Sequence, residues 1–361
     1  MRSILRRFTA VLAAATLLAL PVAAIAQSSA PPAGAAAAPS VPMAGPDAQA
    51  QRQRAQPGNN APVWRGVNSD MEHTTTLPRH EGGRLIQREG ERWRQLRNGP
   101  VTQLGGWALI VVVIAIGAFY AIRGQMKLHG PKTGRVVERF TIVERTVHWS
   151  MAISFVLLAV TGLALLFGKH VVVPVLGHGV FSWIAAASKL VHNYIGPLFS
   201  VCVLIGFLTF VRDNIPNRGD LVWVKAAGGL FNGTHVPSHR FNAGEKTWFW
   251  GGLFVLGIAV SVSGFVLDFP NFEQTRAQMQ LAWTVHAIGA LLFVLAACGH
   301  IYMGTVGVEG AYRAMKTGYV DETWAREHHE WWYDDVASGR IPAQRSAAPG
   351  PAGTPDRAQP V

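Results

Sequence analysis

One apolar stretch, residues 281–304, limits most strongly what this chain can fold into. It contains no Asp, Glu, Lys or Arg, and a membrane-spanning helix needs about 20 mostly apolar residues. Two histidines, His286 and His300, lie within it 14 positions apart. On a helix these positions fall within about 40° of one another and are separated by about 21 Å in depth. An ionisable side chain inside a membrane is unfavourable and usually functional. The two histidines on one face therefore predict two cofactors stacked across the bilayer.

The composition supports a membrane protein. Of the 361 residues 49% are hydrophobic and only 15% are charged, against about 25% charged in a typical soluble domain. The net charge is +11, but no compact basic domain lies outside the apolar spans, so nucleic-acid binding is not supported. Both cysteines, Cys202 and Cys298, fall in apolar spans and no C-x-x-C is present, which argues against zinc and iron–sulfur sites.

The N-terminal part predicts an export signal and a tether. Residues 1–26 have a basic start, an apolar middle and a small-residue exit, typical of a secretory signal peptide; an uncleaved anchor is the alternative. Residues 27–103 begin with a segment rich in Ala, Pro, Gly and Gln and continue with Trp64, Trp93 and six arginines between positions 79 and 97. We predict a periplasmic tether and an arm that orders only against a partner. A solvated arm is the alternative.

Five mature spans are predicted, at residues 104–123, 147–167, 190–211, 248–267 and 281–304. A periplasmic loop, 168–187, is expected between the second and third, and Pro197 is expected to bend the third. Lysines and arginines concentrate at 123–139, at 212–246 and beyond 313, as they do in cytoplasmic loops. The mature N-terminus is therefore expected in the periplasm and the C-terminus in the cytoplasm of a multi-pass protein of the bacterial inner membrane.

Depth pairs the histidines of the spans. A lone membrane histidine is often only an interhelical hydrogen-bonding group, but four occur here at matching depths. His192 and His286 each begin a helix that enters from the periplasm, whereas His148 and His300 lie near the cytoplasmic face. Imidazole is a common haem ligand. The four histidines therefore predict two haems b, each held by two imidazoles and suited to electron transfer.

Several motifs of this chain resemble the cytochrome b (gamma) subunit of membrane-bound respiratory formate dehydrogenase. They include Val147-His148-Trp149, Leu190-Val-His192, Asn214-Ile-Pro216, Phe241-Asn242-Ala-Gly244, the His286–His300 spacing and Trp324-Ala-Arg-Glu-His328-His329. The resemblance covers residues 138–336. It implies an all-α membrane protein, with a four-helix transmembrane dihaem cytochrome b core and, at 104–123, one extra N-terminal transmembrane helix. Residues 337–361 are expected to form a disordered cytoplasmic tail.

The resemblance also implies site roles. His148 and His300 would bind the cytoplasmic haem iron, and His192 and His286 the periplasmic one. A quinone pocket beside the cytoplasmic haem would use His300 and Asn242 of the Asn-Ala-Gly turn. Glu245 stands where glutamine can occur, in the loop where a proton path must start. For both Asn242 and Glu245, loop capping is the alternative role.

The implied activity is electron transfer from formate to quinone, either menaquinone or ubiquinone. Formate would be oxidised in a molybdenum or tungsten alpha subunit, and an iron–sulfur beta subunit would pass electrons to the periplasmic haem. Quinone would be reduced on the cytoplasmic side, with protons taken from the cytoplasm. The cytochrome b subunit of a respiratory hydrogenase or thiosulfate reductase, and a haem-free membrane anchor, are the alternatives.

Overall fold

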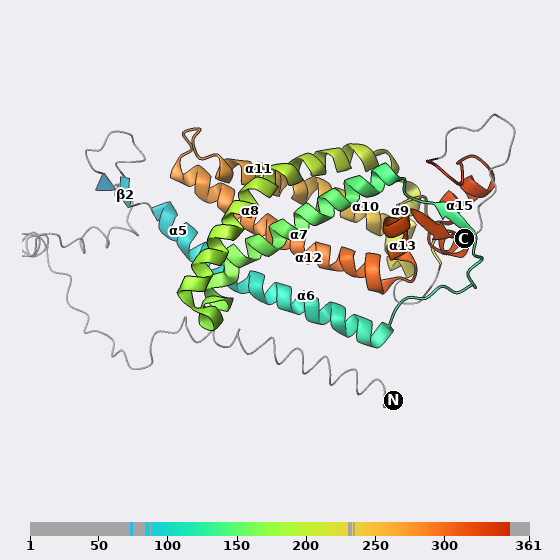
Figure 1. Cartoon of the computed structure of the whole chain (residues 1–361), viewed down its shortest axis with the longest axis horizontal. Coiled ribbons are helices and arrows are strands. Elements are labelled where there is room, and N and C mark those ends of the chain that lie inside the picture. The colour runs from blue at the N-terminus through green and yellow to red at the C-terminus, as the bar shows by residue number, and fades with distance from the viewer. Residues whose placement is uncertain (1–72, 75–83, 87, 230–232, 234, 347–361) are drawn as a thin grey trace, which may run out of the picture.

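The computed structural model describes residues 73–74, 84–86, 88–229, 233 and 235–346 (Figure 1). The predicted signal peptide and most of the tether lie outside the described residues. In the arm, β1 (His73–Thr74) and β2 (Arg84–Ile86) pair antiparallel.

Five long apolar helical segments form the body of the molecule, and each is long enough to cross a membrane. They are α6 (Thr102–Arg123), α7 (Ile142–Val171), α8 (Val173–Phe210), the run of α10 (Ala243–Thr247), η5 (Trp248–Leu256) and α11 (Gly257–Asp268), and α12 (Arg276–Tyr302) with η6 (Met303–Gly307). Only 6% to 28% of the most apolar window of each span is buried, so many apolar side chains of the spans stay exposed, as lipid-facing helices require. The predicted all-α membrane fold is confirmed.

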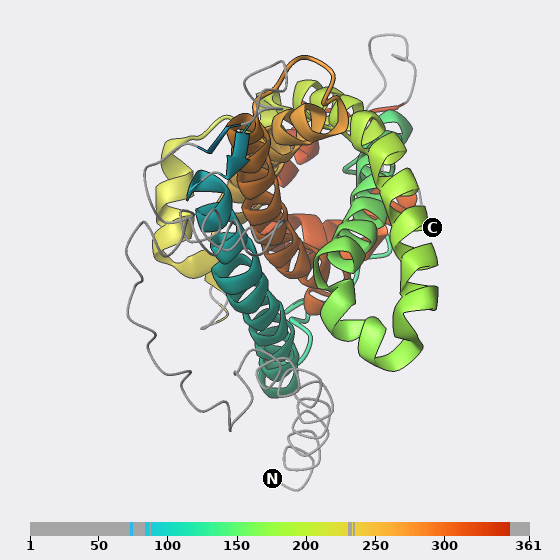
Figure 2. The same ribbon diagram turned by 90° about the vertical axis from the view of Figure 1, so that its left-hand side faces the viewer.

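The helices are arranged as a four-helix bundle with one addition. Helix α7 packs along α8, and α11 packs along both α12 and α8. Helix α6 lies on the outside of this bundle, mainly against α12, as the views in Figures 1 and 2 both show. The extra N-terminal helix is therefore an addition to a complete bundle.

The predicted loop at 168–187 is wrong, because this segment is helical. Helix α7 continues to Val171 and α8 begins at Val173. Pro174 favours a helix start, since a proline at the first helical positions loses no intrahelical bond. The backbone of α8 breaks at Gly177, whose φ of 75° suits glycine, and not at Pro197, where a bend was expected.

The predicted arm also differs where it is described. Helix α5 (Arg88–Leu96) and the π-helical segment η2 (Arg97–Val101) continue directly into α6, so residue 103 is not an element boundary. Trp93 packs edge-on against Trp283 of α12 with ring centroids 5.4 Å apart. The Arg97 guanidinium lies 5.3 Å from the Trp283 ring centroid, within cation–π distance. This part of the arm is ordered by the chain itself.

A compact cap closes the end of the bundle near His148 and His300. Strand β3 (Val136–Glu138) pairs antiparallel with β4 (Tyr319–Asp321). Around them lie the short elements η3 (Arg212–Asn214), α9 (Arg218–Lys225), η4 (Ala227–Gly229), α13 (Ala311–Thr317), α14 (Glu322–His328) and α15 (Glu330–Ala337). Its core includes Phe140, Val320, Trp324 and Trp332, all at most 3% exposed.

The prediction of a disordered tail from residue 337 is wrong for its first part. The Ala343 carbonyl oxygen accepts a hydrogen bond of 2.8 Å from the Glu138 backbone N–H. The Ser346 hydroxyl and backbone N–H both donate to the Glu138 carboxylate. These contacts hold the chain on the cap as far as Ser346, and residues 347–361 lie outside the described part.

Candidate cofactor and substrate site

The structure brings the four span histidines together in two pairs. His148 of α7 faces His300 of α12, with ring centroids 6.3 Å apart. His192 of α8 faces His286, also of α12, with centroids 6.0 Å apart. The two pairs lie at two levels of the bundle because α12 supplies one member of each.

The spacing within each pair fits a shared metal. A metal–imidazole nitrogen bond is about 2 Å long, and each ligating nitrogen lies about 1.1 Å from its ring centre. Two imidazoles on opposite sides of one metal therefore have centroids about 6.3 Å apart, close to both observed distances. Neutral imidazole is a common iron ligand in haem proteins, so the residues present fit a haem at each level.

Hydrogen bonds orient the rings of the His192–His286 pair. His286 Nδ1 lies 3.0 Å from the Val260 carbonyl oxygen, which can only accept. The Thr161 hydroxyl donates to the Leu157 carbonyl at 2.7 Å, so its oxygen accepts from His192 Nδ1 at 2.9 Å. Both rings then carry their proton on Nδ1, and Nε2 is left as the metal-binding atom.

Glycines that the sequence reasoning missed make room for the same two rings. A Cβ on Gly162 would lie 3.2 Å from His192 Cε1, and a Cβ on Gly264 would lie 3.2 Å from His286 Cε1. Each glycine directly follows a hydroxyl residue that contacts the same histidine, Thr161 or Ser263. A hydroxyl–glycine dipeptide in two separate spans is the signal that could have identified them.

The His148–His300 pair is held differently. Among the described residues, His148 Nδ1 is buried without a hydrogen-bond partner. The His300 ring stacks on Trp248, with centroids 4.5 Å apart and planes 10° apart. Trp248 opens the π-helical segment η5, and a Cβ on Gly252 would lie 2.7 Å from its ring. Such π-helical turns are frequent at functional sites, and no residue pattern indicated this one.

Asn242 and Glu245 form the N-terminal cap of α10. Asn242 Oδ1 accepts from the Glu245 backbone N–H, and a Glu245 carboxylate oxygen accepts from the Asn242 backbone N–H, both at 3.0 Å. The capping role is therefore observed for both residues. Glu245 also accepts a 2.8 Å hydrogen bond from Arg139. Glu245 is one turn before Trp248, which brings the capped turn to the His300 side of the bundle.

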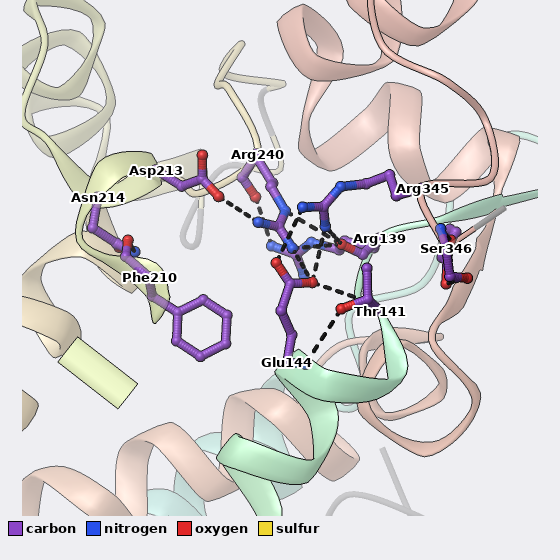
Figure 3. Close-up of polar contacts among 10 residues, drawn as sticks. Arg139, Thr141, Glu144, Phe210, Asp213, Asn214, Arg240, Arg345 and Ser346 are labelled. Atoms are coloured by element: carbon purple, nitrogen blue, oxygen red, sulfur yellow. Dashed lines mark hydrogen bonds and ion pairs between the residues drawn. The ribbon is translucent and has the colours of Figure 1, made fainter. Parts of the chain in front are cut away.

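A buried ion cluster that the sequence reasoning missed fixes the start of α7 (Figure 3). The Glu144 carboxylate accepts hydrogen bonds from Arg240 at 2.7 Å and from Arg345 at 2.9 Å. Arg240 also pairs with Asp213 of η3. Burial lowers the pKa of Arg240, and the two carboxylates of Glu144 and Asp213 oppose that shift. We call Glu144, Asp213, Arg240 and Arg345 the Glu144 cluster. Glu144 is four residues before His148, so the cluster anchors the helix turn that carries this histidine.

A pocket of about 370 Å³ opens beside this cluster. Its lining is mostly polar and comes from η3, the segment before α10, α15 and the tail. The lining residues are Arg212, Asp213, Ile215, Asn217, His239, Arg240, Lys246, Trp332, Asp335, Ile341 and Arg345. The pocket therefore gives solvent access to the cap beside Lys246, the residue that follows Glu245.

Comparison with known proteins gives matches over the bundle and the cap. Residues 139–318 match the family described as prokaryotic cytochrome b561. A formate dehydrogenase cytochrome b556(fdo) subunit of Escherichia coli K12 is 28% identical over 209 residues, covering 55% of this chain and 93% of the relative. The formate dehydrogenase, nitrate-inducible, cytochrome b556(Fdn) subunit of the same organism is 25% identical over 213 residues, which cover 56% of this chain and 92% of the relative. The formate dehydrogenase cytochrome b556 subunit of Haemophilus influenzae is 24% identical over 208 residues, which cover 55% of this chain and 82% of the relative. The family match includes all four paired histidines.

Proposed function

This chain belongs, through residues 139–318, to the prokaryotic cytochrome b561 family, and from that premise we propose that it is the membrane cytochrome b subunit of a formate dehydrogenase. The relatives that carry this name support the assignment. The observation that carries it is the pair of facing histidines at each of two levels, with centroids 6.3 Å and 6.0 Å apart.

We infer the cofactor ligands from the two pairs. His148 and His300 would hold one haem b, and His192 and His286 would hold the other. When bound, each haem supplies reversible one-electron transfer. Thr161 and the Val260 carbonyl fix the imidazole planes of the second pair, whereas Trp248 fixes that of His300. With two imidazoles to hold each haem, the sites would suit electron transfer.

The substrate site lies at the His300 end. Quinone binds beside Trp248 and the capped turn of Asn242 and Glu245, where the Asn242 amide nitrogen makes no hydrogen bond among the described residues. Formate is oxidised in a separate molybdenum or tungsten subunit, and an iron–sulfur subunit delivers its electrons at the His192–His286 end. This end faces the periplasm, and the cap faces the cytoplasm.

Purification of the native complex tests the proposal. We expect the chain to co-purify with two larger subunits, one of which contains iron–sulfur clusters, and to contain two haems b for each copy. Haem would be counted by the pyridine haemochrome spectrum against protein determined by amino-acid analysis. A chain that purifies without haem b would support the haem-free anchor instead.

The orientation is tested by reporter fusions. An alkaline phosphatase, which is active only in the periplasm, should be inactive when fused after Val361 and active when fused after Val172 between α7 and α8. The reason is the concentration of Lys and Arg on the loops at the cap end. The reverse pattern of activities would mean that the chain is inserted the other way.

The hydrogen bond of His192 provides a second prediction. Thr161→Val keeps the side-chain shape but removes the acceptor of His192 Nδ1. The imidazole becomes a weaker electron donor, so the midpoint potential of one haem should rise while the other stays unchanged. Thr209→Val is the control, because among the described residues its hydroxyl bonds to the Ile205 carbonyl alone. Equal potentials in the wild type and Thr161→Val, measured by optical redox titration, would refute the orienting role.

A further inference from the structure

We propose that His329 and Glu245 form a proton-holding pair that supplies protons to quinone at the His300 end, an inference that rests on the proposed function. His329 belongs to the His-His motif between α14 and α15, for which the haem sites provide no role. It lies outside the segment matched by the family, which ends at residue 318.

The geometry leaves one ring nitrogen of His329 free to accept a proton. His329 is 1% exposed, and its Nδ1 lies 2.8 Å from the His239 carbonyl oxygen. A carbonyl only accepts, so Nδ1 carries the ring proton and Nε2 has the lone pair. Nε2 lies 3.9 Å from Glu245 Oε2, too far for a hydrogen bond in this state. A proton bound at either atom would draw the two together as an ion pair or a hydrogen-bonded pair.

The surrounding charges keep this pair unprotonated until negative charge arrives. Arg139 donates to Glu245 from one side, and the groups that face His329 are Arg139, Glu245, His328 and the His239 carbonyl. Burial, followed by the positive charge of Arg139, lowers the pKa of His329 to about 3. A neighbouring negative charge raises the affinity of both groups for a proton. Electrons that reach quinone therefore make the pair take up the proton that the product needs.

A solvent-accessible pocket lies close to His329. His239, whose carbonyl accepts from His329, lines the pocket of about 370 Å³. Trp332 also lines this pocket, and its ring lies edge-on to His329 with centroids 6.4 Å apart. The Ser238 hydroxyl is 3.2 Å from His329 Nδ1. Two residues that contact the buried ring, His239 and Trp332, therefore also line the pocket, while Glu245 lies on the Nε2 side of the ring.

The proton and electron balance is simple. Reduction of quinone to quinol takes two electrons, which formate supplies through the partner subunits, and two protons. For each proton, an O–H bond forms at a quinone oxygen, and the bond to Glu245 Oε2 or His329 Nε2 breaks. The pair takes up each of these protons beforehand from water in the pocket that His239 lines.

His328 is a matched neighbour that lacks this arrangement. Its Nδ1 lies 3.1 Å from the Trp324 carbonyl oxygen, and its ring stacks on Trp324 with centroids 4.7 Å apart. It is thus a second largely buried histidine with a backbone-bonded Nδ1, in the same turn, but without an ion-pair distance to Glu245. Replacing it tests the effect of losing a histidine from this motif.

The test uses the assembled complex and three variants. In His329→Asn the amide nitrogen can keep the bond to the His239 carbonyl, but the Nε2 atom that faces Glu245 is lost. His328→Asn is the control. Glu245→Gln keeps the capping box, which accepts Gln as well as Glu, and removes the ionisable group. The measurements are haem b content, the rate of haem reduction by formate, and the rate of haem reoxidation by a short-chain quinone between pH 6 and pH 8.

We expect His329→Asn and Glu245→Gln to keep both haems and wild-type reduction by formate. Reoxidation by quinone should slow by about a hundredfold and fall more steeply with rising pH than in the wild type. His328→Asn should reoxidise at the wild-type rate. Wild-type reoxidation in both Glu245→Gln and His329→Asn, or an equal loss in His328→Asn, would overturn the proton role. A wild-type complex that quinone does not reoxidise would refute the proposed function itself.

Discussion

Replacing His286 with alanine is expected to empty the haem site of the His192–His286 pair while the site of His148 and His300 stays filled. Each iron needs both imidazoles, and about 21 Å along α12 separates His286 from His300, too far for one porphyrin to bridge. Formate should then no longer reduce the remaining haem. His192→Ala should give the same result, because this residue is the second ligand of the same site.

Variants of the His148–His300 pair should block electron exit to quinone rather than electron entry from formate. His148→Ala or His300→Ala should empty the other site and block quinone reduction, while formate still reduces the haem that remains. Asn242→Ala should keep both haems reducible but slow quinone turnover. The measurement is the low-temperature spectrum of the haem b band before and after formate, with quinone turnover followed alongside.

The control for these variants is His178→Ala, an exposed histidine near the start of α8, which should change neither spectrum nor turnover. The pairing is wrong if His300→Ala keeps full quinone reduction. It is equally wrong if His286→Ala and His148→Ala lose the same spectral component.

Glu144→Gln is expected to destabilise the protein by about 3 kcal/mol, the lower end of the range for removing one partner of a buried ion pair. The variant leaves Arg345, which is partly exposed, without its carboxylate, whereas Arg240 keeps its pair with Asp213. The start of α7 would loosen, and the His148–His300 site should lose haem before the other site does. Thermal unfolding in detergent, followed by haem release, measures both effects.

Glu91→Gln provides the comparison, since the exposed Glu91–Arg94 pair lies on α5 and surface pairs contribute little. Its melting temperature should match that of the wild type. If Glu144→Gln has the melting temperature of the wild type, the cluster does not anchor α7.

Periodicity and depth were sufficient to predict the five spans and to group the four histidines into the two pairs that face one another in the structure. Helix ends were less predictable, because residues 168–187 are apolar and helix-forming although they carry histidines, glycines and a proline. The order of the arm at Trp93 and Arg97 was not predicted, because both contact Trp283, which is far away in the sequence in the last span.

The Glu144 cluster and the His300 environment had no sequence signal of their own. Arg240 and Arg345 are 96 and 201 residues from Glu144 along the chain, so only the folded cap brings them together. The stacking of Trp248 on His300 depends on the π-helical register of η5 and on the space at Gly252. The hydroxyl–glycine pairs Thr161-Gly162 and Ser263-Gly264 are local, and a search of the spans for them could have found them.

The central claim, that this chain passes electrons from formate to quinone, is tested most directly in membranes that contain the assembled complex. Formate is added without oxygen, and the haem b band is recorded before and after a short-chain quinone is supplied. The account predicts that the reduced band appears with formate and disappears with quinone. A band that stays oxidised with formate but is reduced by hydrogen would contradict it, and would assign the chain to a hydrogenase.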